Sequence, residues 1–170
     1  MCAQETSSRK LVRDLMTVGV QTCPTHMPIG DVARLLLDKG LEGIVVLDEE
    51  GHGVGVVSRD DLARAYGRGN GDHLTAEDVM SEGVPQVPPD IPLAGAAQLM
   101  ADNGWRVAFL MHNAGGIIYP AAMISTTHFL RHLAAQSDDD LCDLGIKAER
   151  RPPVEAFKER RDAARRKFDI

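Results

Sequence analysis

The chain contains two copies of one sequence unit, and this internal repeat limits its fold more than any other feature. One copy lies within residues 11–66 and the other within residues 76–135. At a constant offset of 64 residues, the coinciding pairs are Met16 and Met80, Val20 and Val84, Pro24 and Pro88, Pro28 and Pro92, Ala33 and Ala97, and Gly40 and Gly104. The offset becomes 67 where Ser58 meets Ser125, so the second copy has three more residues in its middle turn. This duplication predicts a module with a pseudo-twofold axis, whose natural binding places are the two related clefts between the copies.

Each copy has the same predicted order: an extended stretch, a helix, two strands and a second helix. In the first copy we expect a strand at residues 18–23, a helix from Pro28 to its end at Gly40, and strands at 44–47 and 54–57. Ser58 has the place of a helix N-cap, with two aspartates in the first turn after it. In the second copy the corresponding helices are expected at residues 94–102 and 126–135, and the strands at 107–111 and 117–124.

The remaining segments lie at the ends and between the copies. We expect a flexible N-terminus at residues 1–10, a glycine-rich linker at 67–75, and a charged, partly helical C-terminal tail at 136–170. Residues 149–167 of the tail carry eight Arg or Lys and four Asp or Glu, and residues 154–168 can form a helix. A solvated helix, a dimer-packing arm and a basic docking element for an acidic partner remain open interpretations of this tail.

Composition narrows the classes of protein and partner. The net charge is −6 although the tail is basic, so the rest of the chain is acidic. An acidic surface disfavours nucleic acid as a partner. No apolar run approaches the length that spans a bilayer, and the polar N-terminus lacks an apolar signal core, so we expect a cytoplasmic protein with no membrane partner. Cys2, Cys23 and Cys142 are far apart and form no CxxC motif, so ordinary reduced thiols are expected.

No catalytic or metal-binding motif is visible, and we expect neither an enzyme nor a metal protein. The sequence lacks GxSxG, a Walker loop and GxGxxG, and its adjacent carboxylates cannot flank a substrate. His128 and His132 have a spacing that can hold a metal on a helix, but no nearby acid or cysteine completes a ligand set.

The order of motifs across both copies resembles a CBS domain pair, also called a Bateman module, over residues 11–133. The motifs of the first copy are DLM, ARLLLDKG, IVVLDEEG and GVGVVSRDDL, and those of the second are VM, AAQLMADNG and AMISTTHFL. The resemblance implies an α/β (α+β) fold, in which tandem β-α-β-β-α repeats pack by their sheets around the pseudo-twofold axis and the pairs dimerise into a disc. It also implies an adenosyl ligand (AMP, ADP, ATP, S-adenosylmethionine or NAD(H)) that regulates a partner protein. A stand-alone pair would act on that partner in trans, with no other cofactor required.

The start of the second helix of the first copy is the candidate site. A helix N-terminus offers unpaired N–H groups to a phosphate, Ser58 can add a hydroxyl, and Arg59 can add a charge. Asp61 can accept the two hydroxyls of a ribose, and equally it can act only as a capping residue. We expect the adenine between Val18–Val20 and the strand entry at Gly43 and Ile44, where the family usually has a proline in place of Ile44.

The second cleft differs at one decisive position. Ser125, the counterpart of Ser58, is the candidate ligand-binding residue here, and His128 follows it at the spacing at which Asp61 follows Ser58. An imidazole cannot accept a diol as a carboxylate does. We therefore expect at most one nucleotide per chain. Trp105, where the first copy has Leu41, either packs at the dimer surface or stacks on a ligand. The competing hypothesis for the whole chain is an interaction scaffold of the same fold that binds no nucleotide and docks a partner through its basic tail.

Overall fold

The computed structural model describes residues 10–69 and 73–136 of the chain. Most of the expected N-terminal lead-in, part of the linker and nearly all of the charged tail, including its predicted helix at residues 154–168, lie outside these residues. Cys2 and Cys142 lie outside them as well.

The first copy folds in the predicted order, with one short helix added at its start. Its elements are α1 (Val12–Leu15), β1 (Thr17–Val18), β2 (Thr22–Pro24), α2 (Ile29–Lys39), β3 (Gly43–Leu47), β4 (Gly53–Ser58) and α3 (Arg59–Gly67). Gly40 ends α2 with φ of 62°, a left-handed conformation that glycine adopts without steric cost. The predicted single strand at residues 18–23 is wrong, because Gly19 has φ of 89° and separates β1 from β2.

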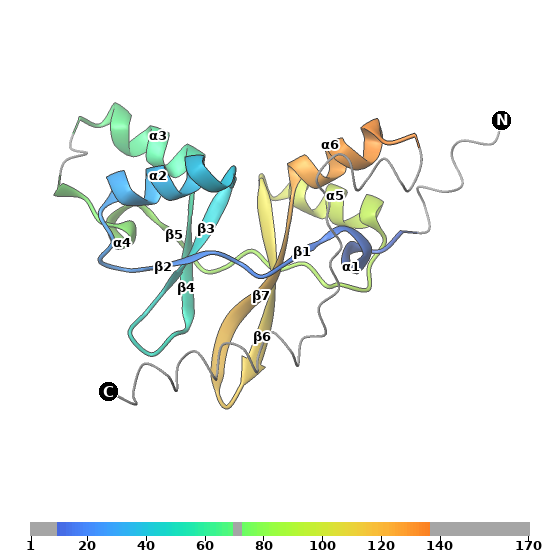
Figure 1. The fold of residues 1–170 in the computed structure, drawn as a ribbon, viewed down its shortest axis with the longest axis horizontal. Helices are drawn as coiled ribbons and strands as arrows, with labels where there is room; N and C mark the ends of the chain where they lie inside the picture. The colour runs from blue at the N-terminus through green and yellow to red at the C-terminus, as the bar shows by residue number, and fades with distance from the viewer. Residues whose placement is uncertain (1–9, 70–72, 137–170) are drawn as a thin grey trace.

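The second copy repeats this order, with an isolated bridge from Gln86 to Phe109 in place of a strand equivalent to β2. Its elements are α4 (Ala76–Val79), β5 (Ser81–Glu82), α5 (Leu93–Asp102), β6 (Val107–Ala114), β7 (Ile117–Ser125) and α6 (Thr126–Ala134). The three additional residues of the second copy lengthen the β6–β7 hairpin, which extends well beyond the rest of its sheet (Figure 1). The predicted strand at 107–111 is therefore too short.

The two copies exchange their first strands. In one sheet the order is β1-β7-β6, with Thr17 opposite Met123, and in the other it is β2-β3-β4-β5, with Ser81 opposite Val56. Thus β1 of the first copy completes the sheet of the second, and β5 of the second copy completes the sheet of the first. Figure 1 shows this exchange as the blue chain that crosses to the second copy and the green chain that returns to the first.

Three apolar clusters hold the exchanged arrangement together. The cluster between the sheets consists of Val20, Val45, Val56, Val107, Phe109 and Met123, which come from both copies. In each outer cluster the helix that precedes the exchanged strand packs into the other copy: Val12 and Leu15 join the core of the second copy, and Ala76 joins that of the first. Burial of this apolar surface is what joins the copies into one unit.

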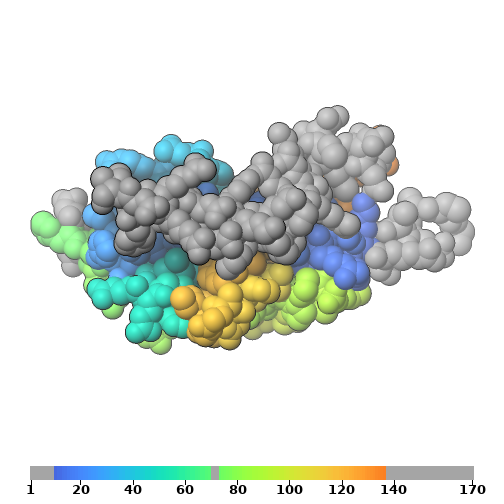
Figure 2. Space-filling model, turned by 60° about the horizontal axis from the view of Figure 1, so that its bottom comes forward, coloured from blue at the N-terminus to red at the C-terminus, as the bar shows by residue number. Residues whose placement is uncertain are grey.

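The two hairpins also lie side by side at the lower edge of the molecule. The backbone N–H of Ile118 in β7 donates to Nδ1 of His52 in the β3–β4 turn over 3.3 Å. Figure 2 shows the two hairpins, teal and yellow, as neighbouring surfaces at this edge. No helix in the described part of the chain combines the length and the apolar character needed to cross a membrane.

Candidate ligand-binding pocket

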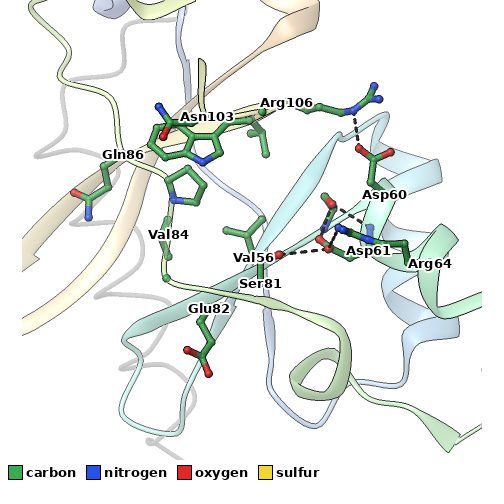
Figure 3. A pocket seen from close by; sticks show the side chains of 16 residues that line it. Val56, Asp60, Asp61, Arg64, Ser81, Glu82, Val84, Gln86, Asn103 and Arg106 are labelled. Atoms are coloured by element: carbon green, nitrogen blue, oxygen red, sulfur yellow. Dashed lines mark hydrogen bonds and ion pairs between the residues drawn. The ribbon is translucent and has the colours of Figure 1, made fainter. Parts of the chain in front are cut away.

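A pocket of about 600 Å³ opens where the first copy meets the exchanged segment of the second. The first copy contributes Val56, Ser58, Asp60, Asp61 and Arg64. The second copy contributes residues 81–86, which include β5, and residues 103–107, which form the turn before β6 (Figure 3). The walls therefore come from both copies, and the volume falls in the range typical of small-molecule sites.

The N-cap of α3 fixes the central carboxylate of this pocket. The Ser58 backbone N–H and hydroxyl donate to Oδ2 of Asp61 over 2.8 and 2.5 Å, and the Asp61 N–H donates back to Ser58 Oγ over 3.2 Å. Asp61 Oδ1 accepts from Arg64 Nη2 at 2.6 Å and from Ser81 Oγ at 3.3 Å. The capping prediction for Ser58 is confirmed. Asp61 is 8% exposed, so its carboxylate is held in one orientation by four donors.

A second ion pair lies at the mouth of the pocket and joins the two copies. Arg106 Nε donates to Oδ2 of Asp60 over 2.7 Å, and both side chains are more than half exposed. Asp60 lies in the first turn of α3, whereas Arg106 lies in the turn before β6. Figure 3 shows this pair beside the Asp61–Arg64 pair, with Glu82 set apart from both.

The equivalent position in the second copy is filled by an imidazole in an internal network. Nδ1 of His128 accepts from the Ser125 backbone N–H over 3.1 Å and lies 2.9 Å from the Ser125 hydroxyl. Because Nδ1 accepts, the ring proton lies on Nε2, which donates to Thr17 Oγ1 over 2.9 Å. Burial, followed by the charge of Arg131, lowers the pKa of His128 from 6.5 to about 4. His128 is therefore neutral near pH 7 and satisfied within the protein.

The pseudo-twofold axis relates the serine cap and the exchanged hydroxyl of one network to those of the other. Thr17 and Ser81 are equivalent at the offset of 64, and His128 and Asp61 are equivalent at the offset of 67. In each cleft the exchanged strand of one copy thus offers a hydroxyl to the capping residue of the other.

The structure separates several of the predicted site residues from Ser58 and Asp61. Val18 pairs with Ala122 in the sheet of the second copy, and Val20 is buried in the cluster between the sheets. Neither valine is among the residues that line the pocket beside Asp61, because strand exchange places β1 in the sheet of the second copy.

Three further predicted residues also lie elsewhere. Ile44 is fully buried in the core of the first copy, so its side chain cannot reach the pocket. Gly43 lies opposite Ser58 in the β3–β4 ladder, outside the lining. Arg59 turns away from the pocket, since its Nε donates to the Leu41 carbonyl over 2.7 Å.

Several pocket-lining residues that were not predicted occupy, in the second copy, the positions equivalent to residues that were predicted in the first copy. Glu82 and Val84 are equivalent to Val18 and Val20 at the offset of 64, and Val107 is equivalent to Gly43. The repeat offset of 64 residues could therefore have identified these lining residues, but only with the knowledge that the two copies exchange their first strands. Trp105, which had two open interpretations, lines the pocket and also packs against the core of the second copy.

The CBS domain family model matches residues 12–68 and again residues 76–135. The chain belongs to the CBS domain family. Its two matches are the two copies recognised from the repeat, and together they form a CBS domain pair.

Two curated relatives resemble the pair in sequence. The uncharacterized protein MK0525 of Methanopyrus kandleri is 25% identical over 131 residues, which cover 76% of this chain and 64% of that protein. The uncharacterized protein MJ1426 of Methanocaldococcus jannaschii is 39% identical over 54 residues, or 32% of each protein. The chain thus spans less than two thirds of the length of either relative.

Solved structures share the fold at low sequence identity. The CBS domain pair of protein MJ0100, in complex with 5'-methylthioadenosine and S-adenosyl-L-methionine, has a TM-score of 0.63 and 19% identity, covering 73% of this chain and 99% of that one. The CBS domain protein TA0289 of Thermoplasma acidophilum has a TM-score of 0.62 and 21% identity, covering 79% and 74%. CBSX2 in complex with AMP has a TM-score of 0.56 and 22% identity, covering 72% and 95%.

Proposed function

We propose that the chain is a regulatory module, which binds an adenosyl ligand in the pocket beside Asp61 and passes its occupancy to a partner protein in trans. The pocket itself carries this proposal, because its walls come from both copies. A ligand that touches both walls favours the arrangement in which they lie closest together, and such a population shift can be transmitted to a partner. The adenosyl ligands bound by the CBS pair of MJ0100 and by CBSX2 support the choice of ligand class.

Two groups in the pocket suit the parts of an adenosyl ligand. The contact from Ser81 to Asp61 Oδ1 is the longest of the four contacts that this carboxylate accepts, so a ribose hydroxyl can replace it with least loss. Trp105 supplies an aromatic face, on which a base can stack for about 1–3 kcal/mol. The expected pose has the ribose at Asp61 and the adenine toward Trp105.

The second candidate function is a scaffold that binds no nucleotide. One observation favours it: Asp61 already has protein donors on both carboxylate oxygens, as a purely structural capping residue would. In the sensor, a ligand hydroxyl replaces one of the protein donors to the Asp61 carboxylate; in the scaffold, all of these donors stay in place.

Thermal unfolding against AMP, ADP, ATP, NADH and S-adenosylmethionine tests the proposal. A ligand present at about 100 times its Kd stabilises the folded state by about 2.7 kcal/mol, which raises Tm by several degrees. Asp61→Ala should abolish the shift. The matched control is Asp78→Ala, because Asp78 accepts from the Thr75 N–H and hydroxyl in the same kind of capping box but lies outside the pocket lining.

The outcomes separate the two candidates. A shift that Asp61→Ala removes and Asp78→Ala keeps establishes the ligand binding that the sensor requires and rejects the scaffold that binds no nucleotide. If Asp61→Ala does not fold, Asp61→Asn takes its place, since it keeps the shape of the side chain and loses only the charge. Wild-type protein that shows no shift with any of the five ligands rejects the sensor and leaves the scaffold.

A further inference from the structure

The charges that line the pocket are arranged unfavourably for a phosphate chain. The described lining contains three carboxylates, Asp60, Asp61 and Glu82, and two guanidinium groups, Arg64 and Arg106. Each guanidinium is already paired with one of these carboxylates, Arg106 with Asp60 at 2.7 Å and Arg64 with Asp61 at 2.6 Å. Within this lining, one carboxylate remains in excess, and neither cation is available without displacing an acid.

The N-terminus of α3, which could hold a phosphate, already has acidic side chains beside it. Asp60 and Asp61 both lie in the first turn of α3, where their charges offset the partial positive charge of the helix N-terminus. An anion bound at this turn would therefore lie near two carboxylates as well as the backbone N–H groups. The side that faces Arg106 has the same difficulty, because Asp60 remains there after the ion pair opens.

We propose that the pocket selects adenosyl ligands of low negative charge, such as nucleosides, thioether nucleosides and sulfonium compounds, and that Asp60 sets this preference. This inference rests on the proposed function of the pocket and specifies its ligand class. The Asp60–Arg106 pair is more than half exposed on both sides, so it opens readily, and pairs of this kind contribute only about 0–1 kcal/mol. The charge of Asp60, rather than the strength of the pair, therefore works against a polyphosphate.

Binding of adenosine, S-adenosylmethionine, AMP and ATP, measured by calorimetry, tests the inference. Wild-type protein should bind adenosine and S-adenosylmethionine more tightly than ATP. Asp60→Asn should improve the affinity for ATP relative to adenosine by about tenfold, since it frees Arg106 and removes the opposing charge. The change should shrink in about 0.5 M salt, because these groups are exposed to solvent and screened.

Asp31→Asn is the matched control. Asp31 also lies in the first turn of a helix, is paired with Arg34 at 2.5 Å, and is 52% exposed, but it lies outside the pocket lining. It changes the net charge by the same amount and should leave the ratio of the two affinities unchanged.

Two results overturn the inference while the proposed function stands. One is wild-type protein that binds ATP more tightly than adenosine. The other is an affinity ratio that Asp60→Asn and Asp31→Asn alter equally, which would mean that net charge acts rather than Asp60. If none of the four compounds binds to wild-type protein, and ADP and NADH give no thermal shift, the proposed function itself fails, and the charge preference fails with it.

Discussion

At the scale of single residues, the two capping positions show how one substitution changes the chemistry of a cleft. Asp61 lines the pocket, and the longest contact that its carboxylate accepts is from the Ser81 hydroxyl at 3.3 Å. His128 places one ring nitrogen on the cap and the other on Thr17 at 2.9 Å, so the side chain spans its cleft. The same backbone position thus serves a pocket in one copy and a structural joint in the other.

His128 should make the stability of the protein depend on pH. Burial holds its pKa at about 4 in the folded state, against 6.5 in the unfolded state. The unfolded chain therefore binds more protons between these values, so the contribution of His128 is complete above pH 6.5 and is lost as the pH falls toward 4. The free energy of unfolding should fall by up to about 3 kcal/mol over this range from this group alone.

Urea unfolding at several pH values between 7 and 4.5 checks this dependence. His128→Asn should reduce the difference in unfolding free energy between the two ends of the range. His73→Asn is the control, because His73 is exposed, and it should retain the wild-type dependence. An unchanged slope in His128→Asn would show that another group causes the loss.

At this scale, the sequence predicted only contacts between residues that are close together along the chain. The Ser58 cap could be predicted because its partners lie within three residues along the chain. The contacts of Asp61 with Ser81 and of His128 with Thr17 span 20 and 111 residues, and no local pattern encodes them. Arg59 was misplaced for a related reason, since only the fold shows that the Leu41 carbonyl lies within its reach.

At the scale of elements, strand exchange decides which residues share a cleft. The helices and the hairpin strands could be predicted from periodicity and glycine positions, because those features determine the local conformation. The strand exchange could not be predicted in this way. Both copies begin with a similar short extended segment, which can pair with either sheet. The prediction that grouped Val18 with Asp61 therefore depended on strand pairing, which the local sequence does not determine.

Gly55 in β4 is required for the close approach of the exchanged strand β5. A Cβ at this position would lie 2.6 Å from Met80 Sδ and 2.7 Å from the Ser81 carbonyl oxygen. Gly55→Ala should therefore push β5 away from β4, destabilise the protein by about 1–3 kcal/mol and weaken ligand binding, because β5 belongs to one wall of the pocket.

Gly95→Ala is the opposite control. Gly95 lies within α5, and a Cβ added there would meet nothing within 4 Å beyond the backbone of its own helix, so alanine should stabilise the protein by about 0.5–1 kcal/mol. Both variants can be compared by urea unfolding. Equal effects of the two substitutions would mean that the contact between β4 and β5 is looser than the structure shows.

At the scale of the whole molecule, the exchange joins the copies into one cooperative unit. Each outer core contains side chains of both copies, and the cluster between the sheets contains valines and Phe109 from both. Neither copy can lose its fold without exposing apolar surface of the other. The pseudo-twofold arrangement follows from the repeat, whereas its asymmetry follows from single positions such as His128.

We therefore expect equilibrium unfolding in a single transition. Trp105 is the chain's one tryptophan and lies in the second copy, so its fluorescence reports on that copy, whereas far-UV circular dichroism reports on both. The two signals should have the same midpoint in urea. In a variant that carries Trp105→Leu and Leu41→Trp, the reporter occupies the equivalent position of the first copy, and its midpoint should again match the dichroism of that variant. The short helices α1 and α4 give each outer core residues from both copies. A second copy that unfolds before the first would therefore contradict this coupling, and with it the route by which a ligand between the copies could act on the whole molecule.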